Sequence, residues 1–384
     1  MSDIHVPCTL CFVVEDRPCN MIDLFAHLPT ERNPMTPLRI GVIGAGGITA
    51  LLHLPEIAAC RDMKVVLVSG RKESRLRRLC DQFDIPRWTQ DYEAVIADDS
   101  VEAVVIATPH PLHVSWGIKA IESGKHVLMQ KPLCGDMAEA NAFVAVAEKT
   151  EKIVLCMPHF SPQVYALRER CLSGEIGKIS GARCRTSHGG PEIYYAGVQD
   201  AFGEQAGEAL WFFDADQASV GALFDMGVYA VANLVAILGS VEQVTGMAGT
   251  FDKPTTLEDG AVLILRMAGG ALVTAETSWC DPARSWELTI HGTAGKFTMP
   301  GLDGGAATRW TPSSYTDEHA PVVKEAVASD HEIGHVHEHF LACIREEKQP
   351  PLSNARAAQH VTEILLAGLE SSRTGRTITL TTTL

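Results

Sequence analysis

The feature that most constrains this chain is a short apolar run that ends in a cluster of glycines. Residues 38–43 read LRIGVI, and residues 44–49 continue with GAGGIT. A segment with helical spacing follows to about residue 60, so the order is strand, glycine turn and helix. In such a unit the glycines permit a tight turn and a close approach of backbone amides to a pyrophosphate, which also meets the helix N-terminus. The predicted dinucleotide site consists of Gly44, Gly46, Gly47 and Ile48.

The same alternation of strand and helix continues to residue 157. Apolar runs at residues 63–68, 101–107, 126–129 and 153–157 are separated by segments with helical spacing. A glycine-rich turn alone also occurs for packing reasons, but this context favours the dinucleotide interpretation. Apolar strands that alternate with helices predict a doubly wound parallel sheet of the Rossmann type.

The pattern changes after Pro158. One long helix is predicted at residues 221–238, and short strand-like runs follow between residues 241 and 299, separated by Gly, Pro and Asp. Successive strands with short turns predict an open, mostly antiparallel sheet in an α+β domain. Two terminal helices, at residues 335–347 and 355–371, are expected to pack back on the Rossmann domain.

Length and charge set the broad class. The chain has 384 residues, and 32 Lys+Arg against 47 Asp+Glu give a net charge of −15. This length supports two domains. We place an N-terminal extension without a secretory signal at 1–36, the Rossmann domain at 37–158, and a substrate and oligomerisation domain at 159–384. The acidic balance opposes binding to nucleic acid or anionic membranes, which attract clustered Lys and Arg, and no apolar run is long enough to span a bilayer.

The cysteines indicate a reducing compartment, and hence a cytoplasmic protein. Eleven are spread along the chain, which is typical of free thiols rather than of a disulfide framework. Cys8 and Cys11 form a CxxC, but no second ligand pair completes a zinc site. The triplet of His335, His337 and His339 resembles a metal cluster. On a helix only its outer two members share a face, so we predict no metal site.

The end of the second strand indicates which dinucleotide binds. An NAD site usually places an acidic side chain there, which accepts hydrogen bonds from the ribose and repels a 2′-phosphate. This chain has Ser69, Gly70, Arg71 and Lys72 at that point and no acid. We therefore predict NADP, with Ser69 and Arg71 on its phosphate and with NAD as the alternative cofactor. The competing interpretation is a solvated basic start of a helix.

Chemistry is expected where the strands end, because ligands of open α/β sheets bind at their carboxyl ends. Lys131 and Pro132 follow the run at residues 126–129. A lysine there can stabilise a developing alkoxide, or act as a base if burial lowers its pKa. Asp225 and Tyr229 are four apart on a predicted helix and so share a face. An acid and a phenol are costly to bury unless they share partners or face a cleft, although each motif alone is also compatible with a structural role.

Together these motifs resemble the Gfo/Idh/MocA oxidoreductases, over about residues 37–380. The resemblance rests on the glycine turn ending in HLP, Ala107-Thr108-Pro109 with His113, GKHV leading into Lys131-Pro132, residues 221–229, and the tail from His339-Phe340 to Gly375-Arg376. It implies reversible oxidation of a secondary alcohol, commonly on a sugar or cyclitol. The family's catalytic lysine falls on Lys131, its aspartate on Asp225 and its usual histidine on Tyr229. The resemblance also implies cofactor contacts at Thr108, Pro109, His113 and Lys131.

The chain departs from the common family pattern at two positions. Gln130 replaces the frequent glutamate before the lysine, and Tyr229 replaces the frequent histidine. Tyrosine there also resembles glucose-fructose oxidoreductase and the dimeric dihydrodiol dehydrogenases, which use NADP. The scheme that we expect is hydride transfer between a carbinol carbon and the nicotinamide. Tyr229, assisted by Lys131, handles the hydroxyl proton, and Asp225 orients the substrate.

Two residues are candidates for the substrate pocket. His188 follows a predicted strand, and Trp211 lies in an aromatic run before the predicted helix; ordinary loop roles are the alternative. The expected partners are a small sugar-like molecule and further copies of the chain, in a homodimer or homotetramer through the C-terminal sheet. Two other functions stay open. One is a redox-assisted glycosidase or lyase that regenerates its cofactor, and the other is an NADP-binding protein without catalysis.

Overall fold

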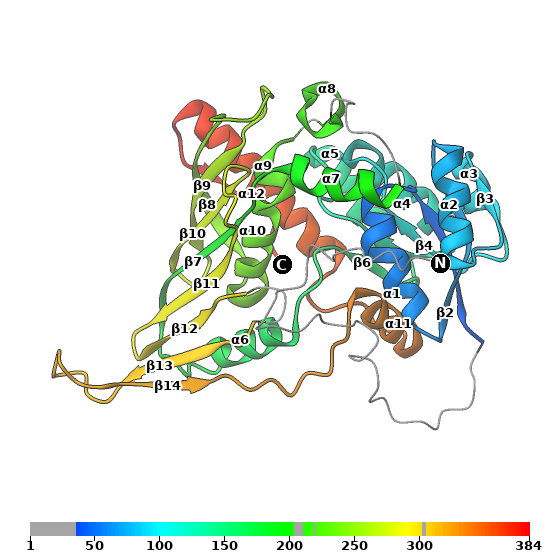
Figure 1. Cartoon of the computed structure of the whole chain (residues 1–384). Coiled ribbons are helices and arrows are strands. Elements are labelled where there is room, and N and C mark those ends of the chain that lie inside the picture. Colours follow the sequence, from blue (N-terminus) through cyan, green and yellow to red (C-terminus); the bar gives the residue numbers. More distant parts are fainter. Residues whose placement is uncertain (1–35, 203–209, 219, 302–304) are drawn as a thin grey trace.

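The computed structural model describes residues 36–202, 210–218, 220–301 and 305–384, which build two sheets (Figure 1). The N-terminal sheet has six parallel strands in the order β3-β2-β1-β4-β5-β6. They are β1 (Leu38–Ile43), β2 (Met63–Ser69), β3 (Trp88–Thr89), β4 (Ala103–Ile106), β5 (His126–Met129) and β6 (Val154–Cys156). This is the strand order of a Rossmann sheet, whose direction of winding reverses between β1 and β4. The predicted N-terminal fold is confirmed.

Helices cover both faces of this sheet, because parallel strands bury both of their faces. One face packs against α1 (Leu54–Ala59) and α2 (Glu73–Phe83). The other packs against α3 (Tyr92–Ala97), α4 (His113–Glu122) and α5 (Met137–Ala147). The side chain of Asp136 accepts a hydrogen bond from the Glu139 amide and so caps α5. The strand ends that carry the candidate site are therefore fixed by cores on two sides.

The C-terminal sheet has nine strands in the order β14-β13-β12-β11-β7-β10-β9-β8-β15. They are β7 (Ile179–Ser187), β8 (Val241–Gly249), β9 (Gly260–Met267), β10 (Leu272–Ser278), β11 (Ser285–Gly292), β12 (Gly295–Met299), β13 (Thr308–Pro312), β14 (Val322–Ala326) and β15 (Ile378–Thr379). Neighbouring strands are antiparallel except β7 and β10, which run parallel. The predicted open, mostly antiparallel sheet is confirmed.

Helices lie against one face of the second sheet and leave the other face open (Figure 1). The covering helices are α6 (Pro162–Leu172), α10 (Gly227–Leu238) and α12 (Ala355–Thr374). α10 is buried along almost its whole length. On the open face, Met247, Val262 and Ile264 are exposed although they are large and apolar.

The long helix predicted at residues 221–238 is wrong in one respect. The structure divides it into α9 (Ala222–Asp225) and α10, with Met226 between them. Thr186 of β7 donates its hydroxyl to the Met226 carbonyl over 2.6 Å, so that carbonyl is satisfied outside the helix. Hydrophobic periodicity carries no signal for such a tertiary bond. The break places Asp225 at the end of one helix and Tyr229 in the first turn of the next.

The two terminal helices join the two halves of the molecule. In α11 (Val336–Glu346), Val336 and Phe340 pack into the same core as α1 and α2. α12, red in Figure 1, packs against α10 and β8 on one side and against α5 and β6 on the other. Among the described residues, no single helix is long and apolar enough to cross a membrane, although the bent pair Ala215–Asp225 and Gly227–Leu238 meets both limits when taken together.

Candidate active site

The glycine turn after β1 has the backbone geometry of a phosphate cradle. Gly44 has a φ of +112°, and a Cβ there would lie 2.3 Å from the Ala107 carbonyl oxygen, so only glycine fits. At Gly46, by contrast, no described atom lies within 4 Å of a Cβ position, and the backbone faces open space. Thr49 stands where many such turns have a third glycine, and its hydroxyl donates to the Gly44 carbonyl. The Thr49 hydroxyl thus fixes the turn internally, while the backbone at Gly46 stays accessible to a ligand.

Neighbouring residues add polar groups to this cradle. Thr108 follows β4 and is buried, and its Oγ1 has no hydrogen-bond partner among the described residues. A buried hydroxyl without a partner next to a glycine turn fits a ligand that is rich in acceptors. α7 (Pro191–Phe202) packs directly against Gly47, where a Cβ would lie 2.4 Å from Val198 Cγ2. The residues at this edge therefore fit a dinucleotide held largely by backbone groups.

The structure contradicts the role predicted for Ser69. Its side chain is fully buried and its hydroxyl donates to the Val42 carbonyl over 3.0 Å, which ties β2 to β1 and leaves nothing for a phosphate. Gly70 is required by packing, because a Cβ there would lie 2.6 Å from Ala45 Cβ in the glycine turn. An acidic side chain at this position is therefore excluded sterically. Arg71, the next residue, is exposed.

Lys131 and Asp225 form the charged centre of the candidate site. Lys131 Nζ lies 2.7 Å from Asp225 Oδ1 and 2.6 Å from the Asp225 carbonyl oxygen. The two side chains are only 13% and 10% exposed. Nζ also lies 5.0 Å from the centroid of the Tyr229 ring, within the range of a cation–π contact. The three residues predicted to carry the chemistry thus come together from the end of β5, the end of α9 and the start of α10.

Electrostatics keep this pair ionised. Burial lowers the pKa of Lys131, but Asp225 and Tyr229 outweigh it and raise that pKa above its ordinary value. Burial raises the pKa of Asp225, but Lys131 and His188 hold that pKa well below its usual range. The condition for a lysine base, a pKa lowered by burial, is therefore not met. At neutral pH Lys131 is an ammonium ion that donates hydrogen bonds.

The second oxygen of Asp225 is held by two further residues. Trp279, which is fully buried at the end of β10, donates its indole N–H to Asp225 Oδ2 over 2.9 Å. His188 Nε2 lies 3.6 Å from the same oxygen, and its Nδ1 accepts a hydrogen bond from the Gly190 amide. The acceptor role of Nδ1 places the ring proton on Nε2, toward the carboxylate. His188 thus lies beside Asp225, and its contact with a substrate stays a prediction. The sequence pattern does not indicate Trp279, whose only signal is its place after a strand.

An aromatic group lies beside the charged centre. The Trp211 indole donates a hydrogen bond to the Tyr195 hydroxyl. The centroid of its ring lies 4.1 Å from that of Phe212 and 5.1 Å from that of His110. His110 is buried, and its Nδ1 has no hydrogen-bond partner within the described ranges. Burial, followed by the charges of His113 and Lys131, lowers the pKa of His110 well below its usual value. His110 is therefore a neutral polar group close to Lys131. In the sequence, the position of His110 shortly after β4 was the feature that could have indicated a place in the site.

His113 acts on the site through the backbone. It is buried, with Nδ1 2.7 Å from the Pro132 carbonyl oxygen and Nε2 2.9 Å from that of Thr108. Burial lowers the pKa of His113, and a neutral imidazole donates to only one of these carbonyl oxygens at a time. The predicted contact of this side chain with the cofactor stays a prediction. The ring lies between the end of β4 and the turn that carries Lys131, within hydrogen-bond distance of a carbonyl on each side.

Two family models match the chain. Residues 38–157 match an oxidoreductase family with an NAD-binding Rossmann fold, and residues 164–298 match the GFO/IDH/MocA C-terminal domain. The uncharacterized oxidoreductase ORF334 of Rhizobium meliloti is 30% identical over 52% of this chain, and the match spans about half of that relative, 55% of its length. Trans-1,2-dihydrobenzene-1,2-diol dehydrogenase of Mus musculus is 29% identical, over 69% of this chain and 81% of that protein.

Solved structures share the fold. GenD2 from gentamicin A biosynthesis, solved in complex with NAD, has a TM-score of 0.74 and 22% sequence identity. The similarity covers 93% of this chain and 100% of that one. With both family models matched in order and both sheets as expected, the chain belongs to the GFO/IDH/MocA family of oxidoreductases with an NAD-binding Rossmann fold.

Proposed function

We propose that this enzyme uses NADP to transfer a hydride between the nicotinamide and a secondary alcohol or ketone of a sugar, cyclitol or related polyol. The observation that carries the proposal is the Lys131 ammonium group, held on Asp225 beside Tyr229 at the ends of the Rossmann strands. The coenzyme supplies the hydride donor or acceptor when it is bound. Backbone groups of the glycine turn would hold it, with Thr108 and Pro109 beside them.

In this scheme Lys131 and Tyr229 manage charge and proton. During ketone reduction negative charge develops on the substrate oxygen, and the Lys131 ammonium group stabilises it. The Tyr229 hydroxyl donates the proton that completes the alcohol, and alcohol oxidation runs the same steps in reverse. Asp225 acts as a positioning residue, because its oxygens are already occupied by Lys131, Trp279 and His188.

NADP rather than NAD is supported by the end of β2. The position that carries an acid in many NAD sites is Gly70, where packing against Ala45 excludes a side chain. Arg71 follows it and is exposed, so it is placed to meet a 2′-phosphate. The diol dehydrogenase named among the relatives supports a substrate with neighbouring hydroxyl groups.

The proposal also covers the oligomeric state and the location of the enzyme. Met247 and Val262 face each other across β8 and β9 on the open face of the C-terminal sheet, and both are exposed. We expect this face to be buried in a homodimer or homotetramer. All cysteines within the described residues are free, which supports a cytoplasmic location.

The decisive experiment is a panel of polyols, aldoses and aromatic diols, assayed with NADP and with NAD. We expect net change of the cofactor with one of these substrate classes. Lys131→Ala should lower kcat by about 100-fold or more, whereas Lys119→Ala, at an exposed lysine of α4, should keep wild-type turnover. Near wild-type turnover of Lys131→Ala would refute the scheme.

Two results would favour the other functions. Product release from glycosides without net change of the cofactor would indicate a redox-assisted glycosidase or lyase. A tight NADP complex without turnover across the whole panel would indicate a binding protein.

A further inference from the structure

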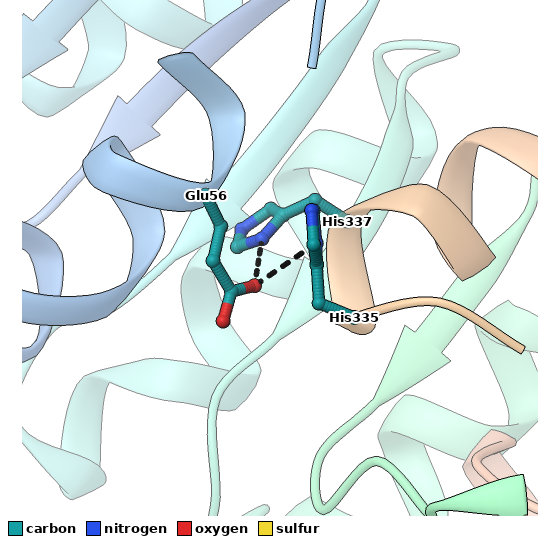
Figure 2. A group of neighbouring side chains, drawn as sticks. All are labelled: Glu56, His335 and His337. Atoms are coloured by element: carbon teal, nitrogen blue, oxygen red, sulfur yellow. Dashed lines mark hydrogen bonds and ion pairs between the residues drawn. The ribbon is translucent and has the colours of Figure 1, made fainter. Parts of the chain in front are cut away.

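A second group of polar residues lies where α11 meets α1, outside the site around Lys131. Figure 2 shows the carboxylate of Glu56, from α1, facing both His335 and His337. Glu56 Oε2 lies 2.8 Å from His337 Nδ1 and 3.2 Å from His335 Nδ1. The helical spacing argument fails here because His335 is the N-cap of α11, with an extended backbone at φ −64° and ψ 170°. It therefore turns toward Glu56 together with His337.

The geometry of this group suits a small cation. The three ligand atoms all lie within 4.8 Å of one another. Ligands at about 2.0–2.2 Å around a tetrahedral Zn²⁺ lie roughly 3.4 Å apart, so small shifts would bring these three into place. Two imidazoles and one carboxylate are a ligand set that such borderline divalent cations prefer.

His335 supplies the second observation. Both of its ring nitrogens are buried, and each faces a carboxylate: Nδ1 lies 3.2 Å from Glu56 Oε2 and Nε2 lies 3.7 Å from Glu338 Oε1. His337 is fully buried beside it. Two imidazoles that converge on one buried carboxylate offer lone pairs that a shared cation can use. Interactions with His335 and His337 also outweigh burial and lower the pKa of Glu56 to about 2, so the carboxylate is ionised.

We propose that Glu56, His335 and His337 bind one divalent transition-metal cation, with Zn²⁺ as the best match, and that its binding is transmitted to the Lys131 loop through His53 and Gln130. Three protein ligands leave a fourth position for water or another donor. The site is separate from the proposed hydride-transfer chemistry, so its presence does not depend on that proposal.

A chain of hydrogen bonds joins this site to Lys131. His337 Nε2 lies 2.9 Å from His53 Nδ1, and His53 Nε2 lies 3.2 Å from Gln130 Nε2. The Lys131 amide donates to Gln130 Oε1 over 2.7 Å. Because that oxygen is occupied, the Gln130 amide group must donate to His53. His53 then donates from Nδ1 to His337, and His337 donates from Nδ1 to Glu56.

A cation reverses the direction of this chain. It needs the lone pair on His337 Nδ1, so the ring proton moves to Nε2 and is donated to His53 Nδ1. The proton of His53 then lies on Nε2 and points at Gln130, whose amide must turn so that its oxygen accepts. The Lys131 amide thereby loses its acceptor. Each imidazole keeps one proton throughout, so the change needs no net proton release.

The site is tested by titrating the full chain with Co²⁺, a visible-absorbing substitute for Zn²⁺. We expect saturable d–d bands, abolished by competing Zn²⁺, at about one equivalent per chain. His335→Ala should weaken binding by about 100-fold or more. This substitution leaves the chain of hydrogen bonds from His337 to Lys131 intact, because His335 is not part of that chain. Glu56→Gln should weaken binding similarly while retaining an oxygen acceptor for His337.

His319→Ala is the matched control, because His319 is almost fully exposed on another segment. Co²⁺ bound by cysteines would show thiolate charge-transfer bands, and His335→Ala would not remove them. Absence of saturable d–d bands, or wild-type Co²⁺ affinity in both His335→Ala and Glu56→Gln, overturns the site.

The coupling is tested by histidine side-chain ¹⁵N NMR of the same proteins. Zn²⁺ should move the proton of His53 from Nδ1 to Nε2 in the wild-type chain and leave it on Nδ1 in His335→Ala. An unchanged His53 tautomer in a Zn²⁺-loaded wild-type chain overturns the coupling and leaves a purely local site.

Discussion

Asp225 governs the protonation of Lys131, and this makes a sharp prediction about pH. Asp225→Asn removes the charge that outweighs burial, so the pKa of Lys131 falls. Ketone reduction needs the protonated amine, and its rate is lost as pH rises through that pKa. The basic limb of kcat/KM against pH should therefore move to lower pH, by about one unit or more. Asp252→Asn, at an exposed aspartate, should leave the profile unchanged. An unmoved basic limb in Asp225→Asn would exclude this role of the carboxylate.

Arg71 tests the choice of cofactor. If its guanidinium meets the 2′-phosphate, Arg71→Ala should raise KM for NADP by about tenfold or more and change KM for NAD little, because NAD lacks that phosphate. Initial-rate measurements with both cofactors decide the point. Arg78→Ala, another exposed arginine of the same region, is the control. Equal losses with both cofactors would place Arg71 elsewhere than on the phosphate.

Side chains differ in how far the sequence could reveal them. The meeting of Lys131, Asp225 and Tyr229 could be anticipated. Lys131 follows the end of a strand, where ligands of such sheets bind, and an acid and a phenol in an apolar helix need partners or a cleft. Ser69 was wrongly assigned, since nothing in the chain order tells that its hydroxyl turns inward to the Val42 carbonyl. Trp279 was not predictable, because its contact with Asp225 spans 54 residues.

At the scale of a single element, the glycine turn allows a prediction about stability and cofactor binding. Gly44→Ala should lower the free energy of unfolding by about 1–3 kcal/mol, since its φ is left-handed and its methyl group meets the Ala107 carbonyl. Gly46→Ala meets no atom and should change stability by less than about 0.5 kcal/mol. It should nonetheless weaken NADP binding, because the methyl group fills the approach to the pyrophosphate. Urea unfolding and NADP titration separate the two effects. Equal stability losses in both variants would contradict this assignment.

Helix boundaries are the elements that periodicity described least well. The break at Met226 follows from the Thr186 hydroxyl, and the inward turn of His335 follows from its place before α11. Both depend on where a chain enters or leaves a helix. Neither changes the spacing of apolar residues, so neither leaves a trace in the pattern.

For the whole molecule, the open face of the C-terminal sheet predicts assembly. Val262 and Ile264 of β9 are 45% and 51% exposed on this face, and exposed apolar side chains that adjoin one another are typical of interaction surfaces. If the proposed oligomer forms through this face, the double change Val262→Asp and Ile264→Asp should give monomers with an unchanged circular dichroism spectrum. Light scattering after size exclusion measures the mass. Leu172→Asp, at an exposed leucine of α6, should leave the mass unaltered. A wild-type mass for the double variant would place the interface elsewhere.

The amino-acid order alone decided the class of this protein: a Rossmann sheet, an α+β partner domain, and the residue types that bind a dinucleotide and handle a proton. Such properties depend on periodicity and turn chemistry, which are local. The tertiary structure decided which groups meet. It set the ammonium state of Lys131 by placing Asp225 against it, placed the His113 ring between the Thr108 and Pro132 carbonyl groups, and brought Glu56 to His335 and His337. These depend on distances between segments far apart in the chain, which no local pattern contains.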